Sequence, residues 1–410
     1  MMYEYFKDMV AGIEAKILQD PSLPNPRKKY ALETARLGSR LYSGENRVAW
    51  CGIAVPFDLL NAMGITSCFA EFVGAALASA GMANPFLEEA ELAGFAGDTC
   101  GFHRSVIGAA RKGVMPVPDF LIATTCPCSG GLAVLENLAH MFNKDLFVLN
   151  VPQEKSEQSV QYLADQIKEM VDFIVRHTGE PLDEGKLKQA IEKTNIARKI
   201  MGDMYGLARK VPSPTDGRLL INFGIVILLF LGTDAAIEIA QAYKDEFTAR
   251  IGNGTQGVPD EKLRLLWIQN RIQFNNPLVE MLEKVYRANI VCDELNDIYW
   301  ESIDPENPYH GMARRAIAQP LNGSIQRRIE HLQKLARNYK LDGAINPCHW
   351  GCRQGTGARG MISDGLREIG VPVLNLEVDC VDTRNYAEGQ LRTRIEAFIE
   401  MLENRPRPWQ

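Results

Sequence analysis

Most of the nine cysteines in this chain lie where a predicted strand ends, which is where parallel-sheet proteins place their ligands. The local spacings, Cys-x-Cys and Cys-x3-Cys, match neither a redox CxxC pair nor the paired CxxC elements of a zinc ribbon. Thiolates that are scattered along the chain and gathered by the fold suit an iron–sulfur cluster. The alternative is that they are small core residues, as we expect for Cys68 and Cys292 in their apolar segments. The cysteines near strand ends or helix starts are Cys51, Cys100, Cys126, Cys128, Cys348, Cys352 and Cys380.

Two histidines lie next to these cysteines in the sequence. His103 is three residues after Cys100, and His349 lies between Cys348 and Cys352. An imidazole in such a place can donate a proton during catalysis or a hydrogen bond to cluster sulfur. The other interpretation is that each is an ordinary polar neighbour of the cysteines.

Other catalytic motifs are missing from the sequence or stand in the wrong context. There is no G-x4-G-K-[ST] P-loop, no G-x-S-x-G elbow and no H-E-x-x-H zinc helix. Residues 355–360 (GTGARG) match a dinucleotide-binding glycine pattern, but PCHWGCRQ separates them from the preceding strand. We expect these small residues to let a helix begin beside a bulky anionic centre. Asp379 and Asp382 flank Cys380, and we expect them to cap the chain or hydrogen-bond locally.

The elements that must position the cysteines alternate between strands and helices. Short β-rich runs bounded by Pro, Gly and Asp predict βαβ units and parallel sheets. The first region has strands at 47–53, 119–125 and 145–151, with helices after Pro56 and at 129–142. The second has strands at 263–268, 289–292, 343–346 and 371–379, and a last helix near 388–404.

We divide the chain into an N-terminal helical segment (1–45), a first α/β domain (46–152), a helical portion (153–258) and a second α/β domain (259–410). The helical portion shows a 3.6-residue apolar period. Its most apolar run, 219–231, is shorter than the roughly 20 residues of a spanning helix, and we expect a buried helix there. Both α/β regions carry a cysteine cluster and then a strand with the tripeptide VLN, so a duplicated unit is plausible.

Composition and charge exclude several classes of protein. Of the 410 residues, 46% are hydrophobic and 23% charged, as in a protein with a sizeable core. Lys+Arg 45 against Asp+Glu 51 gives a net charge of −6, so we expect no nucleic-acid partner. The first twenty residues are amphipathic and resemble no signal peptide. We therefore expect a cytoplasmic protein without membrane attachment, whose cysteines remain in a reducing compartment.

In combination these segments resemble the 2-hydroxyacyl-CoA dehydratase / benzoyl-CoA reductase superfamily. The resemblance covers nearly the whole chain, through CGIAVPFDLLNAMGI (51–65), DTCGFHRSVIGAARKG, DFLIATTC, HWGCRQGTGA and VPVLNLEVDCVDTRNYAEGQLRTRIEAFIEML. One departure is Asp58, where the family commonly carries Glu. The resemblance implies two flavodoxin-like α/β domains with an additional helical portion, and a [4Fe-4S]-type centre between them.

The resemblance also implies which cysteines bind the cluster. Three cysteines hold each cubane in the family, and the matching positions are Cys100, Cys126 and Cys352. The surplus resembles the branch called double-cubane cluster proteins, in which six cysteines hold an [8Fe-9S] cluster in a homodimer. We therefore expect six ligands, with Cys128 as the rival of Cys348: Cys51, Cys100, Cys126, Cys348, Cys352 and Cys380.

The activity that the resemblance implies has three versions. The first is an oxygen-sensitive reductase of small unsaturated molecules that receives electrons from a separate ATP-hydrolysing iron–sulfur activator. The missing P-loop agrees with that division of labour. The second is one subunit of a 2-hydroxyacyl-CoA dehydratase with a single [4Fe-4S] cluster. Such a subunit needs a CoA site, and the sequence offers only scattered arginines for the phosphates of CoA. The third is an electron-storage or relay protein without turnover.

Overall fold

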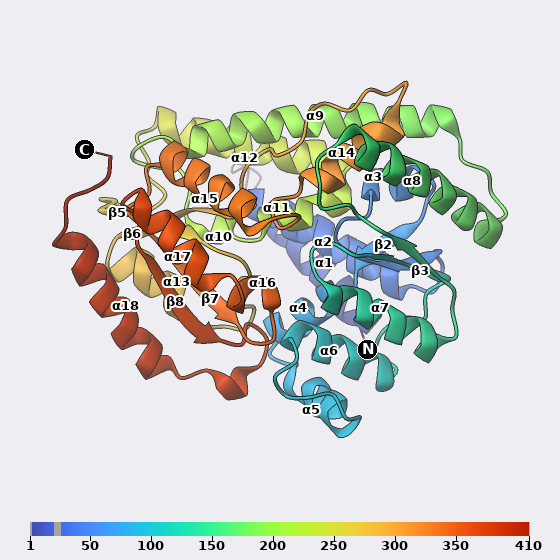
Figure 1. Cartoon of the computed structure of the whole chain (residues 1–410), viewed down its shortest axis with the longest axis horizontal. Coiled ribbons are helices and arrows are strands. Elements are labelled where there is room, and N and C mark those ends of the chain that lie inside the picture. Colours follow the sequence, from blue (N-terminus) through green and yellow to red (C-terminus); the bar gives the residue numbers. More distant parts are fainter. Residues whose placement is uncertain (1, 20–25, 410) are drawn as a thin grey trace.

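Two four-stranded parallel sheets form the centres of the two halves of the protein (Figure 1). The computed structural model describes residues 2–19 and 26–409. The first sheet has the strand order β2-β1-β3-β4, and the second has the order β6-β5-β7-β8. Because the two orders correspond strand by strand, the topology supports a duplicated unit, and the predicted α/β class is confirmed. The strands are β1 Val48–Cys51, β2 Thr66–Phe69, β3 Phe120–Thr124, β4 Leu146–Leu149, β5 Leu263–Trp267, β6 Ala288–Asp293, β7 Gly343–His349 and β8 Val373–Val378.

The VLN tripeptides have matching roles in the two sheets. Asn150 follows β4, and its Oδ1 lies 3.4 Å from the Thr125 hydroxyl at the end of β3. Asn375 lies in β8, and its Oδ1 accepts a hydrogen bond from the Asn346 amide of β7 at 2.9 Å. In each half the asparagine of the tripeptide thus contacts a polar side chain that lies in the third strand or directly after it.

Helices cover the sheets, and a helical portion joins the two halves. In Figure 1, α9 runs along one side of the molecule above both lobes, and it packs against α3 and α12. Ser156 and Asp183 cap α8 and α9, and Gly179 ends α8 with φ +72°. The helices of the N-terminal segment and first half are α1 Met2–Gln19, α2 Pro26–Tyr42, α3 Phe57–Ala62, α4 Glu71–Ser79, α5 Asn84–Leu92, α6 Gly101–Arg111 and α7 Ser129–Phe142. The helical portion contains α8 Glu157–Thr178, α9 Glu184–Ala208, α10 Gly217–Leu220, α11 Phe223–Val226, η1 Ile227–Phe230 and α12 Asp234–Gly252. The second half contains α13 Leu278–Glu280, η2 Met281–Val285, α14 Pro308–Ala318, α15 Ile325–Tyr339, α16 Arg353–Thr356, α17 Arg359–Glu368, η3 Thr383–Asn385 and α18 Glu388–Glu403.

Three local predictions need correction. The apolar run 219–231 is buried for most of its length, but it is α10, α11 and η1 rather than one helix, because Asn222 adopts a left-handed φ of +69°. The strand predicted at 343–346 extends to His349, because β8 continues to pair with it there. Cys348 therefore lies within β7 and not after it. The sequence reading also missed β2, a four-residue strand that pairs with β1.

Within the described ranges, 2–19 and 26–409, no helix combines the length and apolar character that crossing a membrane requires.

Candidate functional site

Cysteines from both halves meet between the carboxyl ends of the two sheets. Cys100 directly precedes α6 of the first half, as predicted, and its Sγ lies 3.1 Å from Nε2 of His349, the last residue of β7. Both side chains are buried, with 8% and 0% of their residues' surface exposed. The predicted neighbours of the cluster are therefore in direct contact across the two halves.

Two glycines allow this close approach. Gly351 has φ +72°, and a Cβ there would overlap the backbone of Thr99 and Cys100. A Cβ on Gly101 would overlap the carboxylate of Asp379. Larger side chains at either position would separate the loop after β7 and the segment after β8 from the start of α6.

The second half contributes three cysteines from β7, the loop after it and the segment after β8. The Sγ of Cys348 is 3.4 Å from Asn375 Oδ1, that of Cys352 is 3.7 Å from Gln269 Oε1, and that of Cys380 is 3.8 Å from the carbonyl oxygen of Asn270. Burial raises the pKa of the Cys380 thiol, and so do the charges that Asp379, Cys352, Cys100 and Cys348 carry when ionised. These thiols are thus close enough to influence one another's ionisation.

Two more cysteines reach this group from the first half. Cys126 follows β3, and its Sγ is 2.8 Å from Gln319 Oε1. Burial raises the pKa of Cys126 to about 12, and ionised Cys128 contributes in the same direction. Cys128 precedes α7 and accepts a hydrogen bond from the Gly131 backbone at 3.3 Å. It also raises the pKa of Cys352 when ionised, although burial of Cys352 is the larger cause.

Cys51 lies elsewhere. It ends β1, is fully buried, and its Sγ is 3.7 Å from the carbonyl oxygen of Ala49. Burial is the largest cause of the raised pKa of Cys68, and the charge of ionised Cys51 adds to it. In the sheet Cys51 pairs with Phe69 of β2, whereas the other six candidate cysteines are linked in pairs by the effect of their charges on one another's pKa. Its assignment as a ligand stays a prediction, and the set of six cysteines proposed below has Cys128 in its place.

The donor chemistry of the six interacting cysteines fits an iron–sulfur group. Burial raises the pKa of most of these thiols, so they need a bound cation to become thiolates, and the iron of a cluster would supply that charge. Among residues 2–19 and 26–409, no three His, Cys, Asp or Glu side chains converge as closely as a single metal ion requires. A cluster of several iron and sulfide atoms holds its thiolates farther apart than one ion does. The six are Cys100, Cys126, Cys128, Cys348, Cys352 and Cys380.

His349 is oriented by hydrogen bonds on both ring nitrogens. Its Nδ1 accepts the backbone N–H of Cys380 at 2.9 Å. Burial lowers the pKa of His349 to about 4, although the carboxylate of Asp379 acts in the opposite direction. The ring is therefore neutral near pH 7, and its single proton is on Nε2, which faces Cys100.

His103 has the opposite ionisation. Burial lowers its pKa, but hydrogen bonds to Cys128 and Glu71 outweigh that effect and raise the pKa of His103 to about 9. Its Nε2 lies 3.4 Å from Glu71 Oε1. His103 is thus a cation near pH 7, and it is the better placed of the two histidines to supply a proton.

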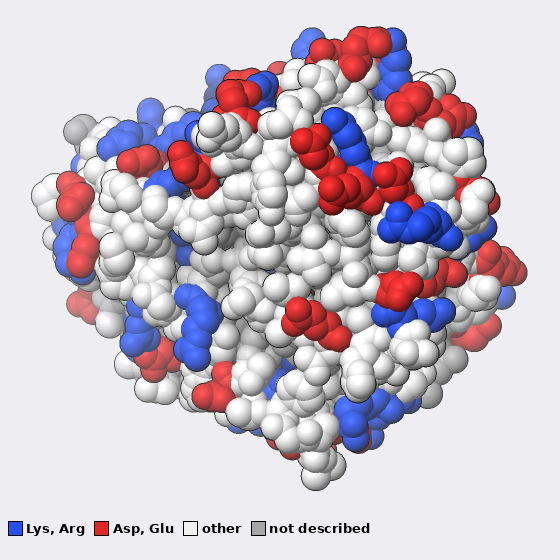
Figure 2. Space-filling view, turned by 45° about the vertical axis from the view of Figure 1, so that its right-hand side comes forward, with Lys and Arg blue, Asp and Glu red and all other residues white. Residues whose placement is uncertain are grey.

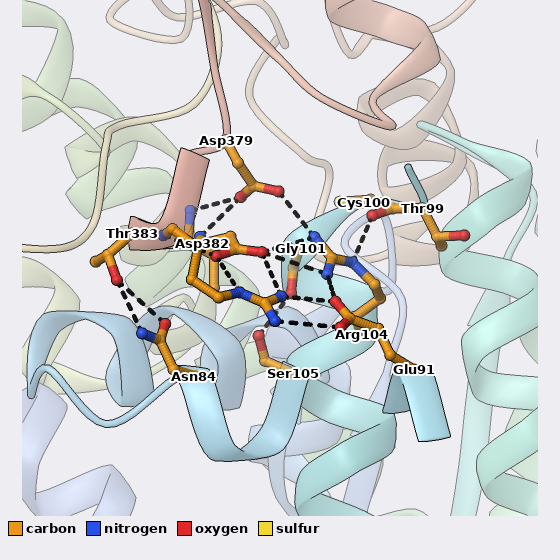
Figure 3. A network of polar contacts seen from close by, with 12 residues as sticks. Asn84, Glu91, Thr99, Cys100, Gly101, Arg104, Ser105, Asp379, Asp382 and Thr383 are labelled. Carbon is orange, nitrogen blue, oxygen red and sulfur yellow. Dashed lines mark hydrogen bonds and ion pairs between the residues drawn. The ribbon is translucent and has the colours of Figure 1, made fainter. Parts of the chain in front are cut away.

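A buried ion network joins α6 to the segment around Cys380 (Figure 3). Arg104, one helical turn after Cys100, donates to Asp379 at 3.1 Å, to Asp382 at 3.3 Å and to the Thr99 carbonyl at 2.8 Å. It also donates to Glu91 of α5. Asp379 and Asp382 make the local bonds that the sequence suggested, since the amides of Val381, Asp382 and Arg384 donate to them. The sequence reading missed Arg104, although its i+4 spacing from Cys100 placed it on the same helix face.

A cavity of about 690 Å³ opens beside the cysteines. Its volume is typical of a small-molecule site. Near the cysteines its wall includes His103, Glu71 and Gln319, together with Cys100, Cys128 and Cys352. Farther away it is lined by residues of α1, α2, α10 and α11. Figure 2 shows acidic and basic side chains interspersed on one face of the molecule, without a large field of one sign.

Comparison with known proteins gives a consistent result. The family model "2-hydroxyglutaryl-CoA dehydratase, D-component" matches residues 52–402. The chain is 23% identical to the (R)-phenyllactyl-CoA dehydratase alpha subunit of Clostridium sporogenes, over 87% of this chain and 89% of that protein. It is 22% identical to one of the subunits of the benzoyl-CoA reductase of Thauera aromatica, over 97% and 98% of the two chains. It is also 25% identical to the (R)-phenyllactyl-CoA dehydratase beta subunit of Clostridium sporogenes, over 63% of this chain and 69% of that protein.

Proposed function

Since the chain belongs to the 2-hydroxyglutaryl-CoA dehydratase D-component family, and its relatives are dehydratases and a reductase, it is an enzyme of this dehydratase and reductase superfamily. We propose that it is an oxygen-sensitive iron–sulfur reductase of small unsaturated molecules, with a cluster of the double-cubane type. The observation that carries the proposal is the set of six interacting cysteines between the two halves, twice the number that one three-cysteine cubane uses.

When bound, such a cluster supplies electrons at low potential. The chain's own residues would tune and protect it. His349 Nε2–H donates a hydrogen bond toward Cys100 Sγ, which stabilises negative charge on that sulfur. Cys126, Cys348 and Cys380 are buried, which keeps water from their sulfur atoms.

His103 is the proposed proton donor. It lines the cavity that also exposes Cys100, Cys128 and Cys352, and its imidazolium is held between Cys128 and Glu71. A substrate bound in the cavity would therefore meet a proton on His103 and sulfur ligands in the same space.

The proposed partners are an ATP-hydrolysing iron–sulfur activator and a second copy of this chain. The sequence has no P-loop of its own, which supports a separate activator. The chain is similar to both the alpha and the beta subunit of one dehydratase, at 23% and 25% identity. Because this one chain resembles both subunits, two copies of it are suited to take the places of the alpha and the beta subunit in a homodimer.

The second candidate is a subunit of a 2-hydroxyacyl-CoA dehydratase with one [4Fe-4S] cluster. The names of the relatives favour it, since most of the matched proteins are dehydratase subunits. The third candidate, an electron relay, has no specific observation in its favour.

Anaerobic turnover separates these functions. The reduced protein is incubated with its activator and either a small unsaturated substrate or a 2-hydroxyacyl-CoA, and acyl-CoA binding is followed by thermal shift. The proposal predicts reduction of the unsaturated molecule and no dehydration of the 2-hydroxyacyl-CoA. Dehydration of the 2-hydroxyacyl-CoA with a clear thermal shift would favour the dehydratase, and reversible reduction without turnover of any acceptor would favour the relay.

A further inference from the structure

The cavity beside the cysteines has a second polar end. Arg271 lines it, on the loop between β5 and α13, together with Arg27 of α2 and Arg218 of α10. The three arginines come from distant parts of the sequence, so the fold and not local spacing brings them to one cavity. Arg27 and Arg218 are exposed, whereas Arg271 is half-buried.

In the part of the chain that the structure describes, half-buried Arg271 has no carboxylate partner, unlike the fully buried arginines. Four of them form close ion pairs: Arg104 with Asp379, Arg264 with Glu261, Arg315 with Asp58 and Arg328 with Glu294. Within the described ranges, the guanidinium of Arg271 makes no hydrogen bond or ion pair. Burial lowers the pKa of Arg271, and repulsion from Arg27 and Arg218 lowers it further. A desolvated cation beside two like charges is costly unless an anion joins it.

Two carboxylates that share the cavity wall, those of Asp293 and Glu294, have other partners. Glu294 binds Arg328 through both of its oxygens, at 2.6 and 2.9 Å. Asp293 accepts the backbone N–H groups of Asn222 at 2.6 Å and Leu295 at 2.8 Å. Arg218 has one exposed ion pair, with Glu280 at 3.4 Å, which solvent screens.

The loop that carries Arg271 is held in place on both sides. The Gln269 backbone N–H donates to Glu294 at 3.2 Å, and the Gln273 backbone N–H donates to the Cys380 carbonyl at 2.8 Å. The same loop contacts the cysteines, through Gln269 Oε1 and Cys352 Sγ at 3.7 Å. The position of Arg271 is therefore fixed relative to the cysteine end of the cavity.

We propose that Arg271, with Arg27 and Arg218, binds the anionic group of a ligand, a phosphate or a carboxylate, whose remainder extends along the cavity toward Cys100, Cys128 and Cys352. A reaction of the far end of this ligand near these cysteines rests on the proposed function. The anion site itself depends only on the arginines and the cavity. A planar guanidinium binds either oxyanion through paired hydrogen bonds.

Calorimetry on the anaerobically prepared protein at low salt tests the site, with inorganic pyrophosphate and succinate as probes. Tighter binding of pyrophosphate would identify a phosphate-bearing ligand, and tighter binding of succinate a carboxylate. Arg271→Gln should weaken the preferred probe about tenfold to a hundredfold, because it removes charged hydrogen bonds. Arg367→Gln, at an exposed residue that pairs with Asp364 and does not line the cavity, is the matched control and should bind like the wild type.

A second variant and an iron measurement distinguish failure of the anion site from failure of the proposed function. Arg27→Gln changes an exposed helix residue, so it should fold normally and still weaken binding. Iron is measured in every sample: anion binding without iron would contradict the proposed function and leave the anion site intact. No binding of either probe by the wild type, or equal binding by Arg271→Gln and the wild type, would overturn the anion site.

Discussion

Nε2 of His349 and Sγ of Cys100 are 3.1 Å apart, and the two residues belong to different halves of the chain. The backbone N–H of Cys380 donates to Nδ1 of His349, so the proton of the neutral ring is on Nε2. Through its two ring nitrogens, His349 therefore links Cys100 of the first half to the backbone of Cys380. If Cys100 binds iron, His349 adjusts the electron density on its sulfur.

Replacing His349 should change the reduction potential of the cluster. His349→Met removes the donor to Cys100, so the reduced, more negative state loses stabilisation and the potential should fall by about 50 mV, roughly 1 kcal/mol for one electron. His349→Gln offers an amide N–H in a similar place and should restore part of the shift. Redox titration followed by electron paramagnetic resonance measures both. Equal potentials for the wild type and His349→Met would exclude this role.

Cys352→Ala should remove the cluster and loosen the interface between the halves. Cys352 comes from the second half and interacts with Cys100 and Cys128 of the first, so metal binding here contributes to folding free energy. Cys68→Ala is the control, since Cys68 is fully buried and lies apart from the six interacting cysteines; it should cost about 1 kcal/mol and keep the iron–sulfur absorption. Iron analysis and thermal unfolding of both variants check this. Full iron in Cys352→Ala would contradict it.

Arg104→Met should strongly destabilise the contact between α6 and the segment around Cys380. It leaves Asp379 and Asp382 buried without their shared cation, which typically costs about 3–5 kcal/mol. Arg384→Met is the matched control, because Arg384 binds Asp382 and Glu91 but is 35% exposed, so its loss should cost much less. Chemical unfolding measures the difference. Similar losses for both variants would show that burial of Arg104 is not decisive.

Glu283 should make the stability depend on pH. Burial, and then the charge of Asp216, raises the pKa of Glu283 from its ordinary 4.5 to about 7. Between these values the folded protein holds a proton that the unfolded chain has lost, so this group's contribution to stability falls as pH rises from about 4.5 to 7. Glu283→Gln stays neutral, so its free energy of unfolding should rise relative to that of the wild type as pH increases over this interval, by up to about 3 kcal/mol. Glu280→Gln, at an exposed position, should show no such gain, and a pH-independent difference for Glu283→Gln would contradict the prediction.

Much of the fold follows from local sequence signals. The predicted helix at 129–142 has the bounds of α7, and seven of the eight strands were placed, because their apolar runs end at Gly, Pro or Asp. β2 was missed because it has four residues and a helix follows almost at once. The break at Asn222 was missed because a left-handed residue leaves no trace in an apolar pattern.

The site was harder to predict than the sheets. The rule on strand ends places Cys126 and Cys352, which follow β3 and β7, at the carboxyl edges of the sheets, but it does not decide the side to which Cys51 points. Successive side chains on a strand face opposite ways, so a shift of one residue along β1 would change the face on which Cys51 lies. The anion site depends on Arg27 and Arg271, which are more than two hundred residues apart in the chain, and no local pattern connects them.

The proposed iron–sulfur site is tested most directly by an iron and sulfide analysis of anaerobically prepared protein, with Cys128→Ser and Cys51→Ser beside the wild type. We expect about eight irons per chain in the wild type and in Cys51→Ser, and a clear loss in Cys128→Ser. Loss of iron from Cys51→Ser alone would restore Cys51 as the sixth ligand in place of Cys128. About four irons in the wild type would contradict the double-cubane proposal, and zinc alone would contradict the iron–sulfur site altogether.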